Sequence, residues 1–351
     1  MMDEKVSIVV STYNSESYIE QCMMSLKNQT YRNLEMVFVD DGSSDQTVKR
    51  CRELAEGDAR IRIYPCTHRG VSATRNEGIG HCTGKYVTFV DSDDYVEPNL
   101  VERYIEAVHF FENNKKDVAF ILCGMHFEVH VGTLEEDLKL VDSRDSFLTL
   151  PREKIGYLCW LKIFNFITNK LYDLETILQK DIQFSRDIQI GEDLRFNLDY
   201  LKAVSGELGV VNEPLYHYVR RTENSLSMVY YKNAISHTKE IYKELIGFAQ
   251  DIENISNDDI MVLKAIYLAD WTRRITALYD NHNGMFTVSE KHRITREEIR
   301  KDEYQQLLKE VHQGKKITTV RYLALRTKRF DLYFLLRRVY RLIRGKKGNG
   351  K

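Results

Sequence analysis

No apolar segment of this 351-residue chain is long enough for a membrane-spanning helix, which needs about 20 residues. We therefore expect no transmembrane span. The opening residues, MMDEKVSIVV, place two acids before a short apolar run, which is not the pattern of a signal peptide. The chain also lacks any Cys-x-x-Cys pair, which argues against a zinc site and against a disulfide framework. A cytoplasmic, reducing location is the resulting expectation. The six cysteines are scattered: Cys22, Cys51, Cys66, Cys82, Cys123 and Cys159.

Glycine-rich phosphate loops are missing as well. Neither G-x-G-x-x-G after the first apolar segment nor G-x-x-x-x-G-K-[ST] occurs anywhere in the chain. A nucleotide diphosphate bound by this protein would need its charge neutralised in another way. A divalent cation held by carboxylates would do so, because Mg²⁺ and Mn²⁺ favour oxygen ligands.

The composition, 43% hydrophobic and 29% charged, is that of a soluble globular protein. The net charge of −1 conceals an asymmetry, because residues 315–351 carry 13 Lys or Arg against the single acid Asp331. Apolar residues within 332–343 follow helical spacing among arginines, which is typical of a helix lying in a membrane interface. The alternatives are a helix packed on the rest of the protein and a nucleic-acid patch. The acidic remainder of the chain disfavours nucleic acid, so an anionic membrane surface is the expected partner.

Strand-like and helix-like segments alternate over the first hundred residues. Short β-rich apolar runs occupy 6–11, 60–64, 86–90 and the beginning of 35–45, and segments with helical spacing lie between them. This alternation predicts an α/β fold with a mostly parallel sheet flanked by helices. Residues 229–351 are helical in pattern, so we expect a domain over 1–228 and a helical C-terminal region over 229–351 that ends in the basic tail.

Polar clusters follow three of these strands. They are Ser11–Asn14, Asp40–Ser44 and Asp91–Asp94. Ligands of parallel sheets bind beyond the carboxyl ends of the strands, so the three clusters are expected along one edge. Asp91 and Asp93 point to the same side of an extended backbone, which suits a metal or a metal plus a ribose contact. The alternative is an ordinary turn or helix cap, for which Asp and Ser are common residues.

Three stretches together resemble glycosyltransferase family 2, whose members are nucleotide-sugar enzymes of the GT-A fold. They are SIVVSTYNSESYIEQCMMSLKNQTYRNLEMVFVDDGSSDQT, GVSATRNEGI and YVTFVDSDD, and the resemblance extends in order over about residues 5–228. It implies an Asp-x-Asp pair, Asp91 and Asp93, that binds Mn²⁺ or Mg²⁺. It also implies contacts of Asp41 with uracil. The other residues implied in donor binding are Ser11, Tyr13, Asn14, Arg75, Asn76 and Ser92.

Two later motifs, NKLYD (169–173) and GEDLRF (191–196), also match the family. A sugar hydroxyl is a poor nucleophile at neutral pH, so a carboxylate must accept its proton, and Asp193 suits this role. Glu192 beside it would contact the acceptor. The alternative is a helix N-terminus, where acids are favourable to the dipole. Lys170 is a candidate diphosphate contact or a solvated lysine, and His217 is a candidate metal ligand or a structural histidine.

These expectations describe an inverting, metal-dependent glycosyltransferase that moves a sugar, most simply from a UDP-sugar, to a hydroxyl of a glycan acceptor. The Q-x-x-R-W motif of processive members is absent around Trp160 and Trp271, which favours single transfers. A lipid-linked acceptor in surface polysaccharide assembly would place the enzyme at the inner face of the cell membrane. The alternatives are a sugar-phosphate nucleotidyltransferase, which should carry a glycine-rich loop, and a non-catalytic relative that binds glycans or membranes.

Overall fold

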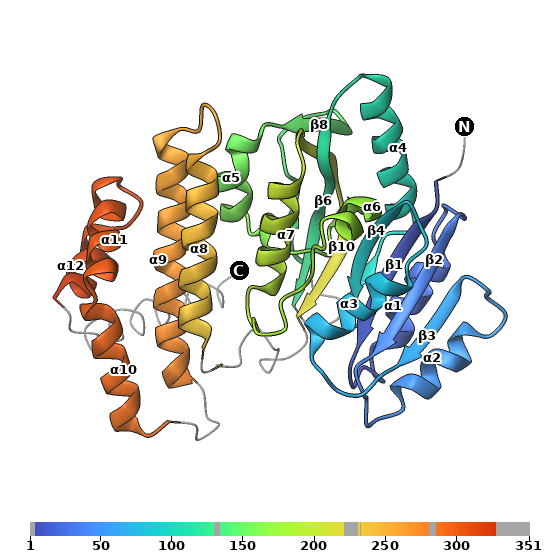
Figure 1. Ribbon diagram of the computed structural model, residues 1–351, viewed down its shortest axis with the longest axis horizontal. Coiled ribbons are helices and arrows are strands. Elements are labelled where there is room, and N and C mark those ends of the chain that lie inside the picture. The colour runs from blue at the N-terminus through green and yellow to red at the C-terminus, as the bar shows by residue number, and fades with distance from the viewer. Residues whose placement is uncertain (1–3, 130–133, 221–230, 232, 281–285, 328–351) are drawn as a thin grey trace, which may run out of the picture. The chain divides into compact units, whose positions relative to one another are not determined.

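The computed structural model of the chain, shown in Figure 1, describes residues 4–129, 134–220, 231, 233–280 and 286–327. The chain forms two compact units, Met1–Ser227 and Met228–Lys351. The first combines a sheet with helices, and the second contains the helices α8 to α12.

The first unit begins with a parallel sheet in which β1 lies between β2 and β4. In spatial order its strands are β3 (Ile61–Pro65), β2 (Leu34–Asp40), β1 (Val6–Thr12) and β4 (Tyr86–Asp91). The connecting helices are α1 (Ile19–Lys27), α2 (Thr47–Ala55) and α3 (Val71–His81). Every residue of β2 is buried, as expected for a continuous apolar run covered on both faces. The predicted alternation of strands and helices is confirmed.

Beyond β4 the sheet becomes mixed. It continues in the order β9 (Lys170–Asp173), β6 (Val118–Val129), β10 (Glu207–Arg220) and β5 (Tyr95–Val96). The strands β7 (Leu134–Leu138) and β8 (Phe147–Leu150) pair with β6 and β10. Strands β6 and β10 are parallel, whereas β9 is antiparallel to both β4 and β6. The α/β prediction is therefore confirmed, and the sheet is mixed where a mostly parallel one was expected.

Helices cover this sheet. Helix α3 packs on β1 and β2, and α4 packs on β6 and β10. Helix α4 spans Leu100–Asn113. The remaining helices of the unit are η1 (Arg152–Lys154), α5 (Ile155–Trp160), η2 (Ile163–Asn165), α6 (Leu174–Gln179) and α7 (Glu192–Ala203).

The start of α1 differs from the sequence pattern, which suggests a capping box of Ser17 and Glu20. The helix begins at Ile19, and its N-cap residue Tyr18 makes no side-chain cap. The backbone N–H groups of Tyr18 and Ile19 instead donate to the carbonyl of Ser15, at 2.8 and 2.9 Å. A backbone turn thus replaces the predicted side-chain cap.

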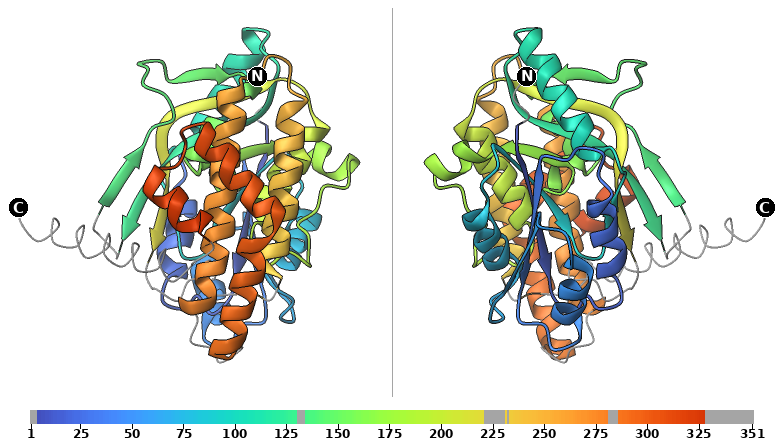
Figure 2. Two further views of the ribbon diagram at one scale, coloured as in Figure 1. Left: turned by 90° about the vertical axis from the view of Figure 1, so that its left-hand side faces the viewer. Right: turned by 90° about the vertical axis from the view of Figure 1, so that its right-hand side faces the viewer.

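The second unit is helical, as expected. Its helices are α8 (Ala234–Gln250), α9 (Asn257–Asp280), α10 (Val288–Arg300), α11 (Asp302–Gln313) and α12 (Thr319–Arg326). Helices α8 and α9 lie side by side, as Figure 2 shows, and α9 also contacts α10 and α11. Trp271 is fully buried, stacks on Tyr267 and donates its indole N–H to Glu298 at 3.0 Å.

Within the described residues, no helix is both long and apolar enough to span a bilayer. The basic amphipathic tail predicted at 328–351 lies outside those residues.

We predict that Gly78→Ala destabilises the protein although alanine favours helices. A Cβ at Gly78 would overlap Cγ1 of Val9, a stiff, buried side chain on β1. Overpacking of this kind costs about 1–3 kcal/mol. Gly80→Ala is the matched control, because a Cβ there meets nothing within 4 Å. This substitution should raise the free energy of unfolding by about 0.5–1 kcal/mol. Urea unfolding followed by circular dichroism measures both, and equal stability of the two variants would contradict the proposed close packing.

Candidate active site

The carboxyl ends of β2, β1 and β4 meet at one edge of the sheet, as predicted. Thr12 pairs in register with Asp40, and Ser11 pairs with Asp91. The Ser15 and Ser92 hydroxyls, 2.7 Å apart, then join the loops that follow β1 and β4. This edge therefore collects the polar clusters that the sequence places after separate strands.

Arg75, on α3, connects three acids at this edge. Its Nη1 lies 2.7 Å from Asp193 Oδ1 and 3.4 Å from Glu192 Oε1, and its Nη2 lies 2.9 Å from Asp91 Oδ1. The Arg75 side chain is only 5% exposed. Burial lowers the pKa of this guanidinium, but its three acidic neighbours outweigh burial and raise it above its usual value. One buried cation thus joins the predicted metal ligand, the predicted acceptor contact and the predicted base.

The three acids that follow β4 occupy different environments. Asp94 is buried, accepts the Tyr216 hydroxyl at 2.7 Å and accepts the Val219 backbone N–H at 2.8 Å. Burial, together with the charges of Asp93 and Asp91, raises the pKa of Asp94 well above its ordinary value. Asp93 is exposed and the Asp91 side chain is 32% exposed. Asp94 is therefore committed to the fold, and Asp91 and Asp93 are the carboxylates that a cation could reach.

Asp193 lies in the first turn of α7, so it is both a helix-start acid and part of the site. Its side chain is 19% exposed. Burial raises the pKa of Asp193 to about 8, against the opposing effect of Arg75. A carboxylate with a raised pKa is a stronger proton acceptor than a solvated one. The position suits the predicted base.

The residues predicted around the nucleoside lie beside one another. Tyr13 is 48% exposed and stacks on His68 with ring centroids 4.6 Å apart. The backbone N–H of Asn14 donates to the Ser43 hydroxyl at 2.9 Å, which ties the loops after β1 and β2 together. His68, which carries no signal in the sequence motifs, is an additional residue of this region.

Asp41 is buried and already has donors on both carboxylate oxygens. The backbone N–H groups of Arg69 and Gly70 donate to it at 2.7 and 2.9 Å, and His68 Nδ1 lies 2.9 Å away. In this structure Asp41 orders the loop before α3. An N–H group of a bound uracil would have to share the Asp41 oxygens with these donors.

Two residues predicted to contact the nucleotide-sugar donor are instead bonded to other parts of the protein. Lys170 is fully buried, with its ammonium bonded to the Ile163 and Phe166 carbonyls and the Asn169 side chain. Burial lowers the pKa of Lys170 to about 7. Since its three N–H donors are occupied, Lys170 offers none to a diphosphate here. Asn76 exchanges two hydrogen bonds of 2.8 Å with the Phe184 backbone, so it holds the segment before α7.

His217 is not brought to Asp91 and Asp93. Its Nε2 lies 2.7 Å from Glu97 and its Nδ1 lies 2.8 Å from Glu128. Successive residues of a strand point to opposite faces, and the neighbouring Tyr216 is the one that reaches Asp94. The predicted role of His217 in the Asp-x-Asp metal shell is therefore corrected.

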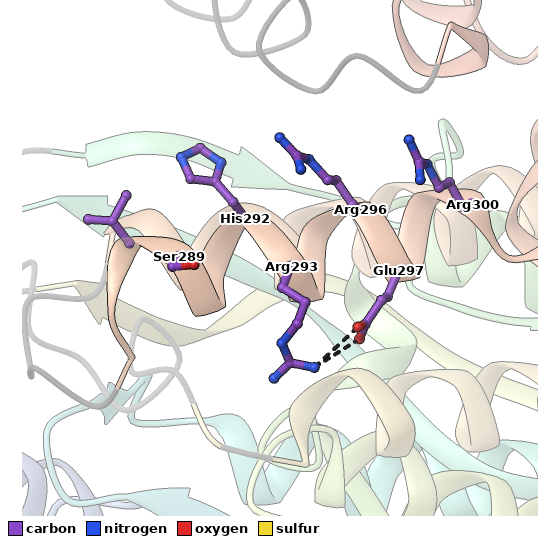
Figure 3. Close-up of a pocket in the computed structure, with 7 residues that line it drawn as sticks. Ser289, His292, Arg293, Arg296, Glu297 and Arg300 are labelled. Atoms are coloured by element: carbon purple, nitrogen blue, oxygen red, sulfur yellow. Dashed lines mark hydrogen bonds and ion pairs between the residues drawn. The ribbon is translucent and has the colours of Figure 1, made fainter.

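A cavity in the described residues is lined entirely by residues of the second unit. It has a volume of about 650 Å³ and is lined by one face of α10 in the second unit. In Figure 3, His292, Arg296 and Arg300 extend from one side of that helix, and Arg293 pairs with Glu297 at 3.1 Å. None of its lining residues belongs to the site around Arg75.

Comparison with known proteins agrees with this geometry. Residues 7–135 match the family model described as glycosyl transferase family 2. The chain is 32% identical over 246 residues to "Uncharacterized glycosyltransferase EpsJ" of Bacillus subtilis, which covers 69% of each chain. It is 31% identical over 251 residues to an "Uncharacterized glycosyltransferase" of Haemophilus influenzae, covering 70% of this chain and 92% of the other.

Among solved structures, S. aureus TarS 1–349 in complex with UDP-GlcNAc superposes with a TM-score of 0.67 at 21% identity. The match covers 96% of this chain and 92% of that chain, which confirms the predicted GT-A fold. The edge of the sheet, the acids gathered on Arg75 and these similarities lead to one conclusion: the chain belongs to glycosyltransferase family 2 and is a glycosyltransferase.

Proposed function

We propose that the first unit transfers a sugar, with inversion, from a UDP-linked donor to a hydroxyl of a glycan acceptor in single, metal-dependent steps. The observation that carries the proposal is the position of Asp91 and Asp193 on either side of the Arg75 guanidinium. A carboxylate suited to a cation and a carboxylate suited to a proton thus lie at one site. The UDP-GlcNAc complex of TarS, which shares the fold, supports a UDP-sugar as the donor class.

Asp193 would accept the proton of the attacking hydroxyl as the new bond to the anomeric carbon forms. The bond from that carbon to the diphosphate breaks on the opposite face, and its electron pair leaves with UDP. Arg75 holds the Asp193 carboxylate in place through the 2.7 Å contact. Glu192, which contacts the same guanidinium at 3.4 Å, would orient the acceptor.

Asp91 and Asp93 would hold Mn²⁺ or Mg²⁺. Their oxygen donors suit these ions, and two carboxylates completed by substrate phosphates are a common arrangement for Mg²⁺. Asp94 is unsuitable, because its oxygens are occupied by Tyr216 and Val219. When bound, the cation would stabilise the negative charge of the departing diphosphate. The donor contacts of Ser11, Tyr13, Asn14, Asp41 and Ser92 are part of the same proposal.

The first test is a UDP-release assay with several UDP-sugars on the parent and on Asp193→Asn. We expect the variant to bind UDP normally and to lose about 10²–10⁴-fold in kcat, the usual value of a positioned base. The unprotonated carboxylate is the active form, so kcat/KM of the parent should fall as the pH drops below about 8. Asp199→Asn, on the same helix and paired with Arg195, is the matched control. Near-normal turnover of Asp193→Asn would assign the base to another residue.

A second test is Asp93→Ala, which we expect to abolish turnover. It should also remove the dependence of UDP binding on Mn²⁺ or Mg²⁺, since the chain has no glycine-rich loop that could replace the cation. Calorimetric titration of UDP with and without Mn²⁺ measures this, with Asp142→Ala as a control at an exposed acid far along the chain. Full metal-assisted affinity in Asp93→Ala would reject the site.

The proposed acceptor is a glycan carried on a membrane lipid. The charge and apolar spacing of 328–351 support peripheral attachment to an anionic surface at the inner face of the cell membrane, where a lipid-linked glycan would be accessible.

We predict that deleting 328–351 releases the protein from vesicles containing anionic lipid and leaves UDP-sugar hydrolysis unchanged. Co-sedimentation at low and high salt measures binding, and replacing Arg337, Arg338, Arg341 and Arg344 by Gln is the comparison that keeps the length of the chain and removes four positive charges. Binding that survives the deletion, or that is insensitive to salt, would refute electrostatic attachment.

A further inference from the structure

A second group of metal-ligating side chains lies apart from Asp91 and Asp93. Glu97, His126 and His217 each place one ligand atom within 4.8 Å of the other two. Across the part of the chain that the structure describes, no other group of three His, Cys, Asp or Glu residues meets this condition. The proposed function does not use these three residues.

Neighbouring strands bring this group together. His217 on β10 is in register with His126 on the parallel strand β6 and with Tyr95 on the antiparallel strand β5. Glu97 follows β5 directly and lies 2.7 Å from His217 Nε2. Residues directly opposite on paired strands project to the same face, so the sheet itself holds the two imidazoles together.

Both imidazoles are oriented by a second carboxylate. His217 Nδ1 lies 2.8 Å from Glu128 Oε1, and His126 Nδ1 lies 2.6 Å from Asp137 Oδ1. With a proton held between Nδ1 and Asp137, the Nε2 of His126 is available as a lone-pair donor. Both nitrogens of His217 face carboxylates, so an ion at its Nε2 would replace the proton between that nitrogen and Glu97. Metal-binding histidines usually have such a partner, which orients the ring and raises its basicity.

The cluster is partly open to solvent and rich in negative charge. The His217 and His126 side chains are 11% and 15% exposed, while those of Glu97 and Asp137 are 38% and 48% exposed. An ion could therefore enter past the two acids. The carboxylates of Glu97, Glu128 and Asp137 gather around the two imidazoles, and a divalent cation would offset their negative charge.

We propose that Glu97, His126 and His217 bind one Zn²⁺ ion, at a site separate from the Asp-x-Asp pair. Two imidazoles and one carboxylate are a common zinc set, whereas Mg²⁺ and Mn²⁺ favour all-oxygen sites. The lack of Cys-x-x-Cys pairs argued against zinc, but this site needs no cysteine. The His217 ring now stacks between Tyr95 and His126, with centroids 4.1 and 4.2 Å apart, so both imidazoles must turn within this stack for their planes to contain the ion.

The ion would link β5 to β6 and β10. Strand β5 begins at Tyr95, immediately after Asp94. A zinc ion there would brace the segment that carries the Asp-x-Asp pair without taking part in the transfer. The site is thus structural with respect to the reaction.

The test uses the metal-stripped full-length chain titrated with Co²⁺, which absorbs visible light strongly in low-coordinate sites, and then with Zn²⁺ as a competitor. We expect one equivalent of strongly absorbing Co²⁺ and a rise in Tm with Zn²⁺. His126→Gln and His217→Gln should abolish the absorption. Asp137→Asn, which removes only the orienting carboxylate, should weaken binding by about 10–100-fold.

Two controls separate this site from other histidines and from the donor site. His109→Gln changes a histidine of α4 that pairs with Glu4, and Asp93→Ala changes the proposed metal site of the sugar donor, so both should retain full Co²⁺ absorption. Unchanged binding in both cluster variants, loss of binding in Asp93→Ala, or no binding by the parent would overturn the proposal. If a histidine variant does not fold, Asp137→Asn decides, because its exposed side chain is replaced by one of the same shape.

Discussion

The candidate active site depends on the ion pairs of the buried Arg75 guanidinium. A buried cation is costly unless it is paired and hydrogen-bonded, and here carboxylates from β4 and α7 supply the partners. The same contacts bring the start of α7 to the carboxyl end of β4, although the two are about a hundred residues apart in the chain. Without Arg75, Asp91 and Asp193 would repel each other across a poorly solvated space. The interaction that stabilises this part of the fold therefore also holds the proposed base beside the proposed metal ligand.

The four aspartates at this edge of the sheet differ in their surroundings, and their proposed roles differ accordingly. Asp93 is exposed and Asp91 is half-buried, so both remain accessible to a cation. Asp94 is buried on Tyr216, and Asp193 is buried beside Arg75 with a raised pKa. Carboxylates in such different surroundings can serve as ligand, structural anchor and base at one site. The division follows from burial, since the residue type is the same at all four positions.

Strand β10 serves two faces of the sheet. Tyr216 points to Asp94 and fixes the turn after β4, whereas His217 points away, between Glu97 and Glu128. Because successive side chains of a strand point to opposite faces, the neighbours Tyr216 and His217 contact different groups: Tyr216 bonds Asp94, and His217 bonds Glu97. The same alternation explains why His217 does not point to the metal site proposed at Asp91 and Asp93.

Local pattern was enough for the alternating strands and helices of the first hundred residues, because apolar periodicity and strand ends are local properties. Local pattern also indicates that Asp91 and Asp93 follow a buried strand and that Asp193 lies at a helix start, whereas their proposed roles come from the family resemblance. It did not reveal the mixed half of the sheet, the burial of Lys170 or the commitment of Asn76 to Phe184. Those depend on which distant segments pair, and so does the meeting of His126 with His217, because strand register is set by packing across the whole sheet and not by neighbouring residues.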